Sequence, residues 1–185
     1  MPVIPDMQNA EGRWLTTKKI NGKQILTISG MKWENLVARC TPGSHTQRLN
    51  PAYIGCTNEF KGFHEFCEWH QSQVGYGHFE VDKDLLIPGN KVYSARTCLL
   101  IPRAINKALI TKRSDRGMPP GVYRSRKRYY AQLNLGGTTK RLGTFDSIEE
   151  AEQAYLAAKR EVLRAWAEEY KDRLDPRAYE ALYAR

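Results

Sequence analysis

The chain has 185 residues, of which 41% are hydrophobic, and a formal net charge of +9. This length accommodates one ordinary domain or two small ones, and the basic balance favours nucleic acid as a partner. No segment approaches the ~20 apolar residues of a membrane span, and the N-terminus lacks the pattern of a secretory signal. We therefore expect a cytoplasmic, intracellular protein without a membrane partner.

The first part of the chain predicts an arm followed by two helices. Apolar and polar residues alternate loosely over 1–29, and Asn21-Gly22 is a typical hairpin turn. A helical pattern follows Ser29-Gly30 and ends near Cys40, and a second helix is predicted at about 62–73.

The middle of the chain predicts short strands and helical turns. Residues 78–84 alternate like a strand, a turn follows at 88–90, and residues 91–93 form a short returning strand. Ser94 is placed to cap a short helix through Cys98, and residues 102–109 suggest a further turn of helix. The polar, breaker-rich segment 111–120 is interpreted as a linker between two domains.

The last third predicts three strands and one long helix. The strands are expected at about 121–126, 128–135 and 139–145, and the helix at about 147–171. Charge is segregated between these elements. Residues 111–143 contain nine Lys or Arg and one acidic residue, whereas residues 144–185 contain seven Lys or Arg and ten Asp or Glu. A basic sheet packed on a helix can present its Lys and Arg side chains to a polyanion.

The sequence pattern of this last module points to a known family. The matching residues are Gly121, Val122, Ala131, Leu142, Gly143, Thr144, Phe145, Glu149, Glu150, Ala151, Ala154, Tyr155 and Ala158. Over residues 121–158 the pattern resembles the ethylene-response-factor (Apetala-type) DNA-binding domain, and we expect this domain at 121–185 with an extended C-terminal helix. The resemblance implies a three-stranded antiparallel sheet packed on one helix, with the outer face of the sheet in the DNA major groove.

Strand alternation independently predicts which side chains meet DNA. Tyr129, Ala131, Leu133 and Leu135 should face the helix. The predicted DNA-binding residues are Tyr123, Arg124, Ser125, Arg126, Lys127, Arg128, Tyr130, Gln132, Asn134, Lys140 and Arg141. Thr139 and Arg141 should share the open face, where Gln and Asn can read base edges, while the basic residues around the first turn hold phosphates. Tyr123, Ser125 and Asn134 stand where the family usually has Arg or Trp, so the family's sequence preference does not transfer.

The stretch from Phe79 to Leu109, with the upstream segments MKWENLVARC, NPAYIGC and FCEWH, carries a second resemblance. It is similar to HNH homing endonucleases of tailed phages, and it defines a domain at 30–110. The resemblance implies a ββα-metal fold in which a strand ends in a metal ligand and a His base. A loop then supplies an Asn, and a short helix supplies the last ligand.

On this pattern Asp82 falls at the ligand position and Lys83 at the position of the His base. Asp84 is the acidic partner, Asn90 the loop Asn, and Thr97 stands at the final ligand site. Lys83 and Thr97 therefore depart from the family, and a lysine with a pKa of ~10.4 is a poor general base.

His78 lies four residues before Asp82 and is either a substitute base on the same strand face or an ordinary surface histidine. Asp82 and Asp84 are either ligands of one Mg²⁺ or Mn²⁺ ion, or an acidic pair that bridges to Lys83 or Lys91. The four cysteines lack the paired spacing of a zinc site, so no structural zinc is expected and the thiols should be reduced.

These observations predict an α+β protein with a degenerate HNH-like domain and a C-terminal sheet on one long helix. The leading hypothesis is a phage-type endonuclease that hydrolyses double-stranded DNA with a divalent metal. A second is a catalytically inactive DNA-binding protein that keeps the fold. A third is a protein that binds and inhibits a host nucleic-acid enzyme.

Overall fold

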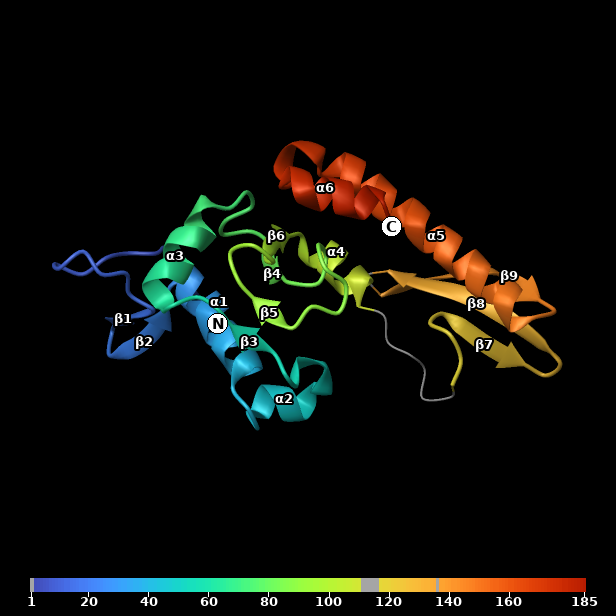
Figure 1. Cartoon of the computed structure of the whole chain (residues 1–185), viewed down its shortest axis with the longest axis horizontal. Coiled ribbons are helices and arrows are strands. Elements are labelled where there is room, and N and C mark those ends of the chain that lie inside the picture. Colours follow the sequence, from blue (N-terminus) through green and yellow to red (C-terminus); the bar gives the residue numbers. More distant parts are fainter. Residues whose placement is uncertain (1, 111–116, 136) are drawn as a thin grey trace. The chain divides into compact units, whose positions relative to one another are not determined.

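The computed structural model describes residues 2–110, 117–135 and 137–185. The chain divides into two compact units, Met1–Ile101 and Pro102–Arg185 (Figure 1). Helices and strands both contribute, so the expected α+β class is confirmed. Most of the predicted linker, residues 111–116, lies outside the described residues. Within the described ranges, no helix is long and apolar enough to cross a membrane.

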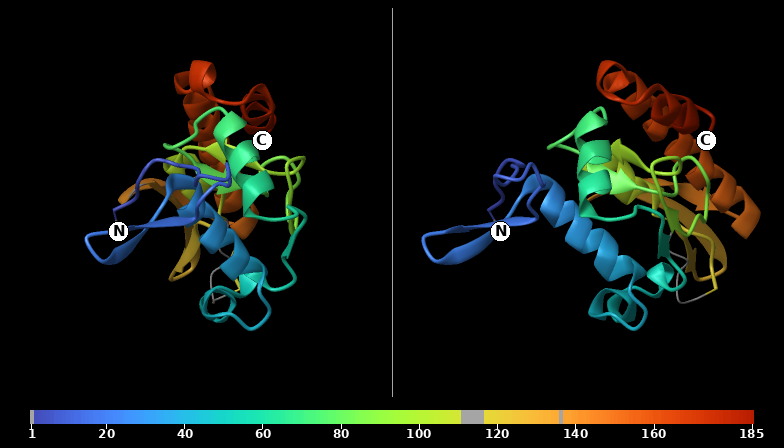
Figure 2. Two further views of the ribbon diagram at one scale, coloured as in Figure 1. Left: turned by 90° about the vertical axis from the view of Figure 1, so that its left-hand side faces the viewer. Right: turned by 60° about the vertical axis from the view of Figure 1, so that its left-hand side comes forward.

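The first unit begins with a hairpin and continues with helices that alternate with short strands. Its elements are β1 (Thr17–Ile20), β2 (Lys23–Leu26), α1 (Ile28–Cys40), α2 (His45–Leu49), the 3-10 helix η1 (Pro51–Tyr53), β3 (Thr57–Asn58), α3 (Phe63–Ser72), β4 (Glu80–Asp82), β5 (Val92–Tyr93) and β6 (Leu99–Ile101). The predicted hairpin and both predicted helices are present, and Figure 2 shows the hairpin extending beyond the start of α1.

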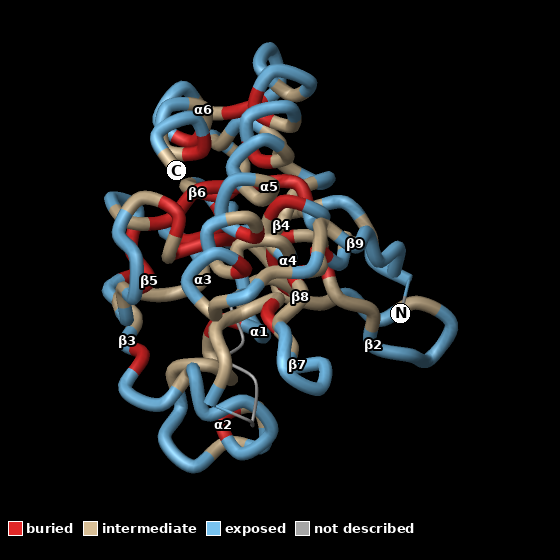
Figure 3. The backbone as a smooth tube through the Cα atoms, turned by 90° about the vertical axis from the view of Figure 1, so that its right-hand side faces the viewer, coloured by how far each residue is buried: buried red, intermediate tan, exposed pale blue. Residues whose placement is uncertain are grey.

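The strand pairing of this unit differs from the expected β-hairpin. Strand β4 pairs antiparallel with β6, whereas β5 pairs parallel with β3. The predicted strand at 91–93 therefore exists, but it does not return to the strand before it. The predicted helix after Ser94 is wrong: the Ser94 hydroxyl accepts from the amide of Thr97 at 3.2 Å, and this closes a turn before β6. Residues 95–97 form this turn, and the fully buried strand β6 begins at Leu99 (Figure 3).

An aromatic cluster forms the core of the first unit. Phe66 is fully buried and lies 5.3 Å, ring centre to ring centre, from Phe60 and 5.6 Å from Trp69. Cys67 and Cys98 are fully buried free thiols, as expected for reduced cysteines. Burial raises the pKa of the Cys98 thiol to about 12, so it is an inert part of the core.

A buried polar network joins the N-terminal arm to two helices. The amide of Ser29 donates to Asp6 Oδ1 at 2.8 Å, and the Ser29 hydroxyl donates to Asp6 Oδ2. Ser29 Oγ also lies 2.7 Å from His70 Nδ1, and the Tyr76 hydroxyl donates to Asp6 Oδ2 at 2.7 Å. Because Asp6 contacts Ser29 and not the imidazole, this group lacks the base–orienter geometry of a catalytic triad. It fastens the arm to the core.

His70 makes the stability of this unit depend on pH. The imidazole is fully buried, and burial lowers its pKa from 6.5 to about 4. An unfolded histidine takes up a proton near pH 6.5, so stability that is present above this pH is lost as the pH falls toward 4.

We expect the unfolding free energy of the wild type to fall by about 2–3 kcal/mol more than that of His70→Gln between pH 7 and pH 4.5. Denaturant titrations across this range measure the difference. Parallel pH profiles for the two proteins would show that His70 is not the responsible group.

The described residues of the second unit form four helical segments and one sheet. Its elements are α4 (Arg103–Leu109), β7 (Val122–Ser125), β8 (Arg128–Leu135), β9 (Thr138–Phe145), α5 (Ile148–Glu169), the 3-10 helix η2 (Lys171–Arg173) and α6 (Pro176–Tyr183). The strands run in the order β7-β8-β9 and are antiparallel. The strands and long helix expected from the sequence agree with these bounds to within two residues, whereas α6 was not expected.

Helix α5 covers one face of this sheet and leaves the other face open. Val122, Ala131 and Leu133 from the sheet form a core with Ala151 and Tyr155 of α5. Ser147 caps the N-terminus of α5: its hydroxyl accepts from the amide of Glu150 at 3.1 Å, a capping arrangement that the SIEE sequence supplies.

Close packing at Gly121 fixes the start of β7 against α5. Its φ of +72° is in the left-handed region, and an added Cβ would lie 2.1 Å from Tyr155 Cδ2 and 2.8 Å from the carbonyl oxygen of Gln132. Gly137 also has positive φ, at +94°, but a Cβ there would meet nothing within 4 Å. The two glycines thus share the backbone constraint and differ in the available space.

Gly121→Ala should therefore destabilise the unit by about 1–3 kcal/mol more than Gly137→Ala, because overpacking adds to the shared backbone strain. Thermal or denaturant unfolding of both variants measures this difference. Equal losses of stability would mean that the contact with Tyr155 does not limit the packing.

Candidate nucleic-acid interface and candidate metal site

Asp82 ends strand β4, as expected, and its carboxylate organises the following turn. Asp82 Oδ1 accepts from the backbone amides of Asp84 and Leu85 at 3.0 and 2.6 Å. The residue is only 7% exposed. Burial raises the pKa of the Asp82 carboxyl above its ordinary value, although the two amide hydrogen bonds oppose this shift.

Lys83, at the position of the expected base, is an ion-pair partner in this structure. Its side chain is 7% exposed, and Nζ lies 2.8 Å from both carboxylate oxygens of Asp84. Nζ also donates to the carbonyl oxygen of Asn90 and lies 5.9 Å from the ring centre of Tyr93. The donors of the Lys83 ammonium group are therefore occupied by these contacts. A lysine held in this way is not suited to act as the general base, which must accept a proton.

Asn90 and Thr97 hold the same loop closed. Asn90 Nδ2 donates to the carbonyl oxygens of Lys83 and Val92 at 2.9 and 2.7 Å, and Asn90 Oδ1 accepts from the Val92 amide at 3.0 Å. The Thr97 hydroxyl donates to the carbonyl oxygen of Val92 at 2.8 Å. Both side chains therefore satisfy backbone groups of the loop.

His78 does not share the strand face of Asp82. It lies in an exposed turn before β4, which begins at Glu80, so the predicted place on the strand is wrong and His78 is a surface histidine, the other of the two alternatives. The physical reason is the run Gly75–Gly77, where positive φ angles at both glycines and backbone hydrogen bonds from His78 and Phe79 to the Gly75 carbonyl keep the chain turned.

The two carboxylates do not fit a divalent ion in this arrangement. Asp84 is neutralised by the Lys83 ammonium, and one oxygen of Asp82 already accepts two amides. No group of three or more His, Cys, Asp or Glu side chains in the described residues is arranged to hold a metal. Of the two interpretations of Asp82 and Asp84, the contacts favour the ion pair with Lys83, whereas Lys91 instead donates to a backbone carbonyl.

The open face of the sheet in the second unit carries polar and aromatic side chains, whereas the other face packs on α5. The strand register brings four pairs of residues together on this open face. Tyr123 of β7 lies opposite Tyr130 of β8. From β8 to β9, Tyr130 lies opposite Thr144, Gln132 opposite Arg141, and Asn134 opposite Thr139. Tyr129, Ala131, Leu133 and Leu135 pack toward α5, so the expected alternation is observed. Arg124 and Lys140, in contrast, lie opposite Tyr129 and Leu133 and belong to the side of the helix.

A β-bulge in β9 determines what the open face presents. Ala131 pairs with Gly143 and Gln132 pairs with Arg141, so Leu142 is an extra residue in β9. Without it, Arg141 and Thr144 would lie on opposite faces, because strand side chains alternate. The bulge places both on the open face, where Arg141 Nη2 donates to Thr144 Oγ1 at 3.0 Å.

Two stacked tyrosines support Arg141. The rings of Tyr123 and Tyr130 have centres 5.2 Å apart and planes 15° from parallel. The Arg141 guanidinium lies 4.6 Å from the centre of the Tyr130 ring. Exposed cation–π contacts of this kind contribute about 0.5–1 kcal/mol, which is enough to bias the position of a long side chain. Sequence patterns alone did not reveal this stack, although the Leu142-Gly143 pair after Arg141 is a signal for the bulge.

The remaining predicted DNA-binding residues surround this row. Arg126, with φ of +55°, and Lys127 form the exposed β7–β8 turn, and Ser125 and Arg128 pair at its base. Arg128 lies 2.8 Å from Asp146 in an exposed ion pair, which holds it only weakly. Asn134 donates to Thr139 at 3.0 Å at the other end of the face.

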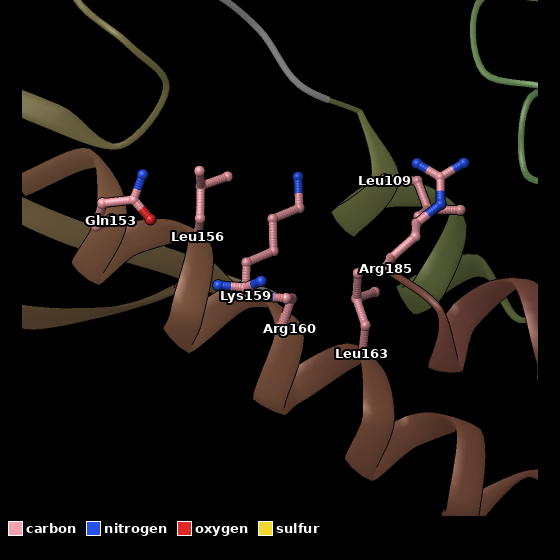
Figure 4. Close-up of a pocket in the computed structure, with 7 residues that line it drawn as sticks. All are labelled: Leu109, Gln153, Leu156, Lys159, Arg160, Leu163 and Arg185. Carbon is pink, nitrogen blue, oxygen red and sulfur yellow. The ribbon is translucent and has the colours of Figure 1, made fainter. Parts of the chain in front are cut away.

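A cavity of about 340 Å³ lies along α5 (Figure 4). It is lined by Leu109, Gln153, Leu156, Lys159, Arg160, Leu163 and Arg185. Burial, together with the nearby charge of Arg185, lowers the pKa of Lys159 below its ordinary value. The cavity combines cations with leucines and lies along the helix, so it is separate from the row of side chains around Arg141.

Comparisons with known proteins leave the chain without an assigned family. No protein-family model, no curated protein and no solved structure matches it.

Proposed function

We propose that this chain binds double-stranded DNA through the open face of the sheet β7-β8-β9. The observation that carries the proposal is the combination of charge and geometry on this sheet. From Gly117 to Phe145 the sequence contains no Asp or Glu, and Arg141 of β9 lies over the ring of Tyr130, which stacks on Tyr123.

Each part of the face has a distinct role in this proposal. Arg141 presents a planar fork of donors that fits the O6 and N7 acceptors of guanine in the major groove, and Gln132 beside it fits adenine. The exposed cations of the β7–β8 turn contact phosphates, which positions the sheet without reading sequence. The resemblance to the ethylene-response-factor domain supports the same orientation.

Variants on the two parts of the interface should behave differently. After a preferred site has been selected from random duplexes, Arg141→Ala and Gln132→Ala should each reduce the ratio of specific to random binding about ten-fold, because each removes a base contact. Lys127→Ala should instead weaken both kinds of binding about equally. Lys127 suits this control because it lies exposed in the β7–β8 turn.

Fluorescence anisotropy with selected and random duplexes measures these ratios. Uniform losses for all three variants would contradict the proposed orientation of the sheet.

The second candidate function is the DNA endonuclease. The position of Asp82 at the end of β4 favours it, and the family it resembles would use Mg²⁺ or Mn²⁺ there. The contacts of Lys83 and Asp84 argue against it, because they leave neither a free base nor an unpaired second carboxylate. We therefore propose the loop between β4 and β5 as a structural element in a DNA-binding protein.

An incubation of supercoiled DNA with the full chain in Mg²⁺ and in Mn²⁺ decides between these functions. We expect no nicking by the wild type and none by Lys83→His, because the histidine would lack a competent metal site beside it. Asp82→Asn is the matched control, since its amide oxygen can still accept from the two backbone amides. Nicking that is lost in Asp82→Asn while DNA binding persists would establish the endonuclease instead.

A further inference from the structure

The hairpin β1–β2 is a regularly paired ribbon with a tight turn. Four residue pairs join its strands, from Thr17 opposite Leu26 to Ile20 opposite Lys23. Asn21 and Gly22 have φ of +49° and +78°, as a two-residue turn with positive φ at both positions requires.

The base of the ribbon is fixed to the start of α1. The Thr27 amide donates to the carbonyl oxygen of Thr16 at 2.9 Å, and the Thr27 hydroxyl donates to that of Leu15 at 2.9 Å. Thr27 Oγ1 also accepts from the amide of Gly30 at 3.0 Å. At Gly30 a Cβ would lie 2.1 Å from the Thr16 carbonyl oxygen, so glycine permits this close approach. The ribbon therefore projects from a rigid base.

The ribbon carries lysines on both of its faces. Register places Lys18 and Lys23 on one face and Lys19 on the other, and all three are exposed. Residues 12–33 contain five Lys or Arg and no Asp or Glu. Across the described parts of the chain, the observed ion pairs include none to Lys18, Lys19 or Lys23.

We propose that this ribbon is a second DNA contact, in which Lys18, Lys19 and Lys23 bind phosphates. The inference rests on the proposed function of the sheet and extends it to the first unit. Lysines are point charges without the planar fork of arginine, so they suit phosphates better than base edges. Because the lysines lie on both faces of the ribbon, each face can contact DNA phosphates and neither face is free to read bases.

The composition of the ribbon favours DNA over a protein partner. Protein interfaces depend on aromatic or arginine anchors at their centre, and the ribbon from Thr17 to Leu26 contains neither. A second contact on the same chain adds to affinity because the first contact raises its effective concentration at the DNA.

The salt dependence of binding by the full chain tests this proposal. The triple variant Lys18→Gln, Lys19→Gln, Lys23→Gln should reduce the slope of log K against log salt by about 2–3, since each lost phosphate contact removes about 0.9. Affinity should fall at least ten-fold at low salt, while the ratio of specific to random binding should stay unchanged. The triple change to arginine should retain the wild-type slope.

A matched control removes the same charge elsewhere on the first unit. Arg48, Lys61 and Arg96 are also exposed, and their triple change to Gln should leave most of the slope intact. Equal slopes for the two glutamine triples would overturn the proposal, because the effect would then belong to net charge. A wild-type salt slope in the variant with Lys18, Lys19 and Lys23 changed to Gln would also overturn the ribbon proposal. The proposal for the sheet would still stand if Arg141→Ala lowers specificity. Absence of any DNA binding by the wild type would end both proposals.

Discussion

The extra residue at Leu142 in β9 determines the chemical character of the open sheet face. It changes the alternation of the strand, so that Arg141 and Thr144 lie on the same face while Leu142 and Phe145 pack toward α5. The hydrogen bond between Arg141, which lies over Tyr130, and Thr144 depends on this change. A regular strand would turn either the arginine or the threonine into the core, and a buried charge without a partner is costly. The bulge thus lets β9 direct apolar side chains toward α5 and polar side chains to the open face.

The C-terminal unit shows how far local patterns determine structure. Alternation of apolar and polar residues locates all three strands, and the Ser147 cap locates the start of α5. The contacts among side chains on the open face are less predictable, because they depend on a register shift between two strands. Helix α6 was missed because its pattern is short, although Asp175 caps it and Ala178 and Leu182 are buried.

The first unit shows where such patterns fail. Strand β5 pairs with β3, more than thirty residues earlier, and β4 pairs with β6 across a long loop. Period-two alternation identifies a strand but does not name its partner. The site expected from the resemblance to HNH enzymes depended on the nearest pairing. In the structure, the residues at Asp82, Lys83, Asn90 and Thr97 are held by one another and by the backbone. Their shared role is to fix a loop that has little regular secondary structure.

In the proposed function, the open face of β7-β8-β9 binds DNA. The most direct measurement is a titration of the isotope-labelled full chain with duplex DNA, followed by backbone and side-chain NMR shifts. We expect saturable shifts concentrated at Tyr123, Tyr130, Gln132 and Arg141, with the helix-facing Ala131 and Leu133 side chains changing little. Shifts confined to α5 and α6, or no saturable shifts at low salt, would contradict it.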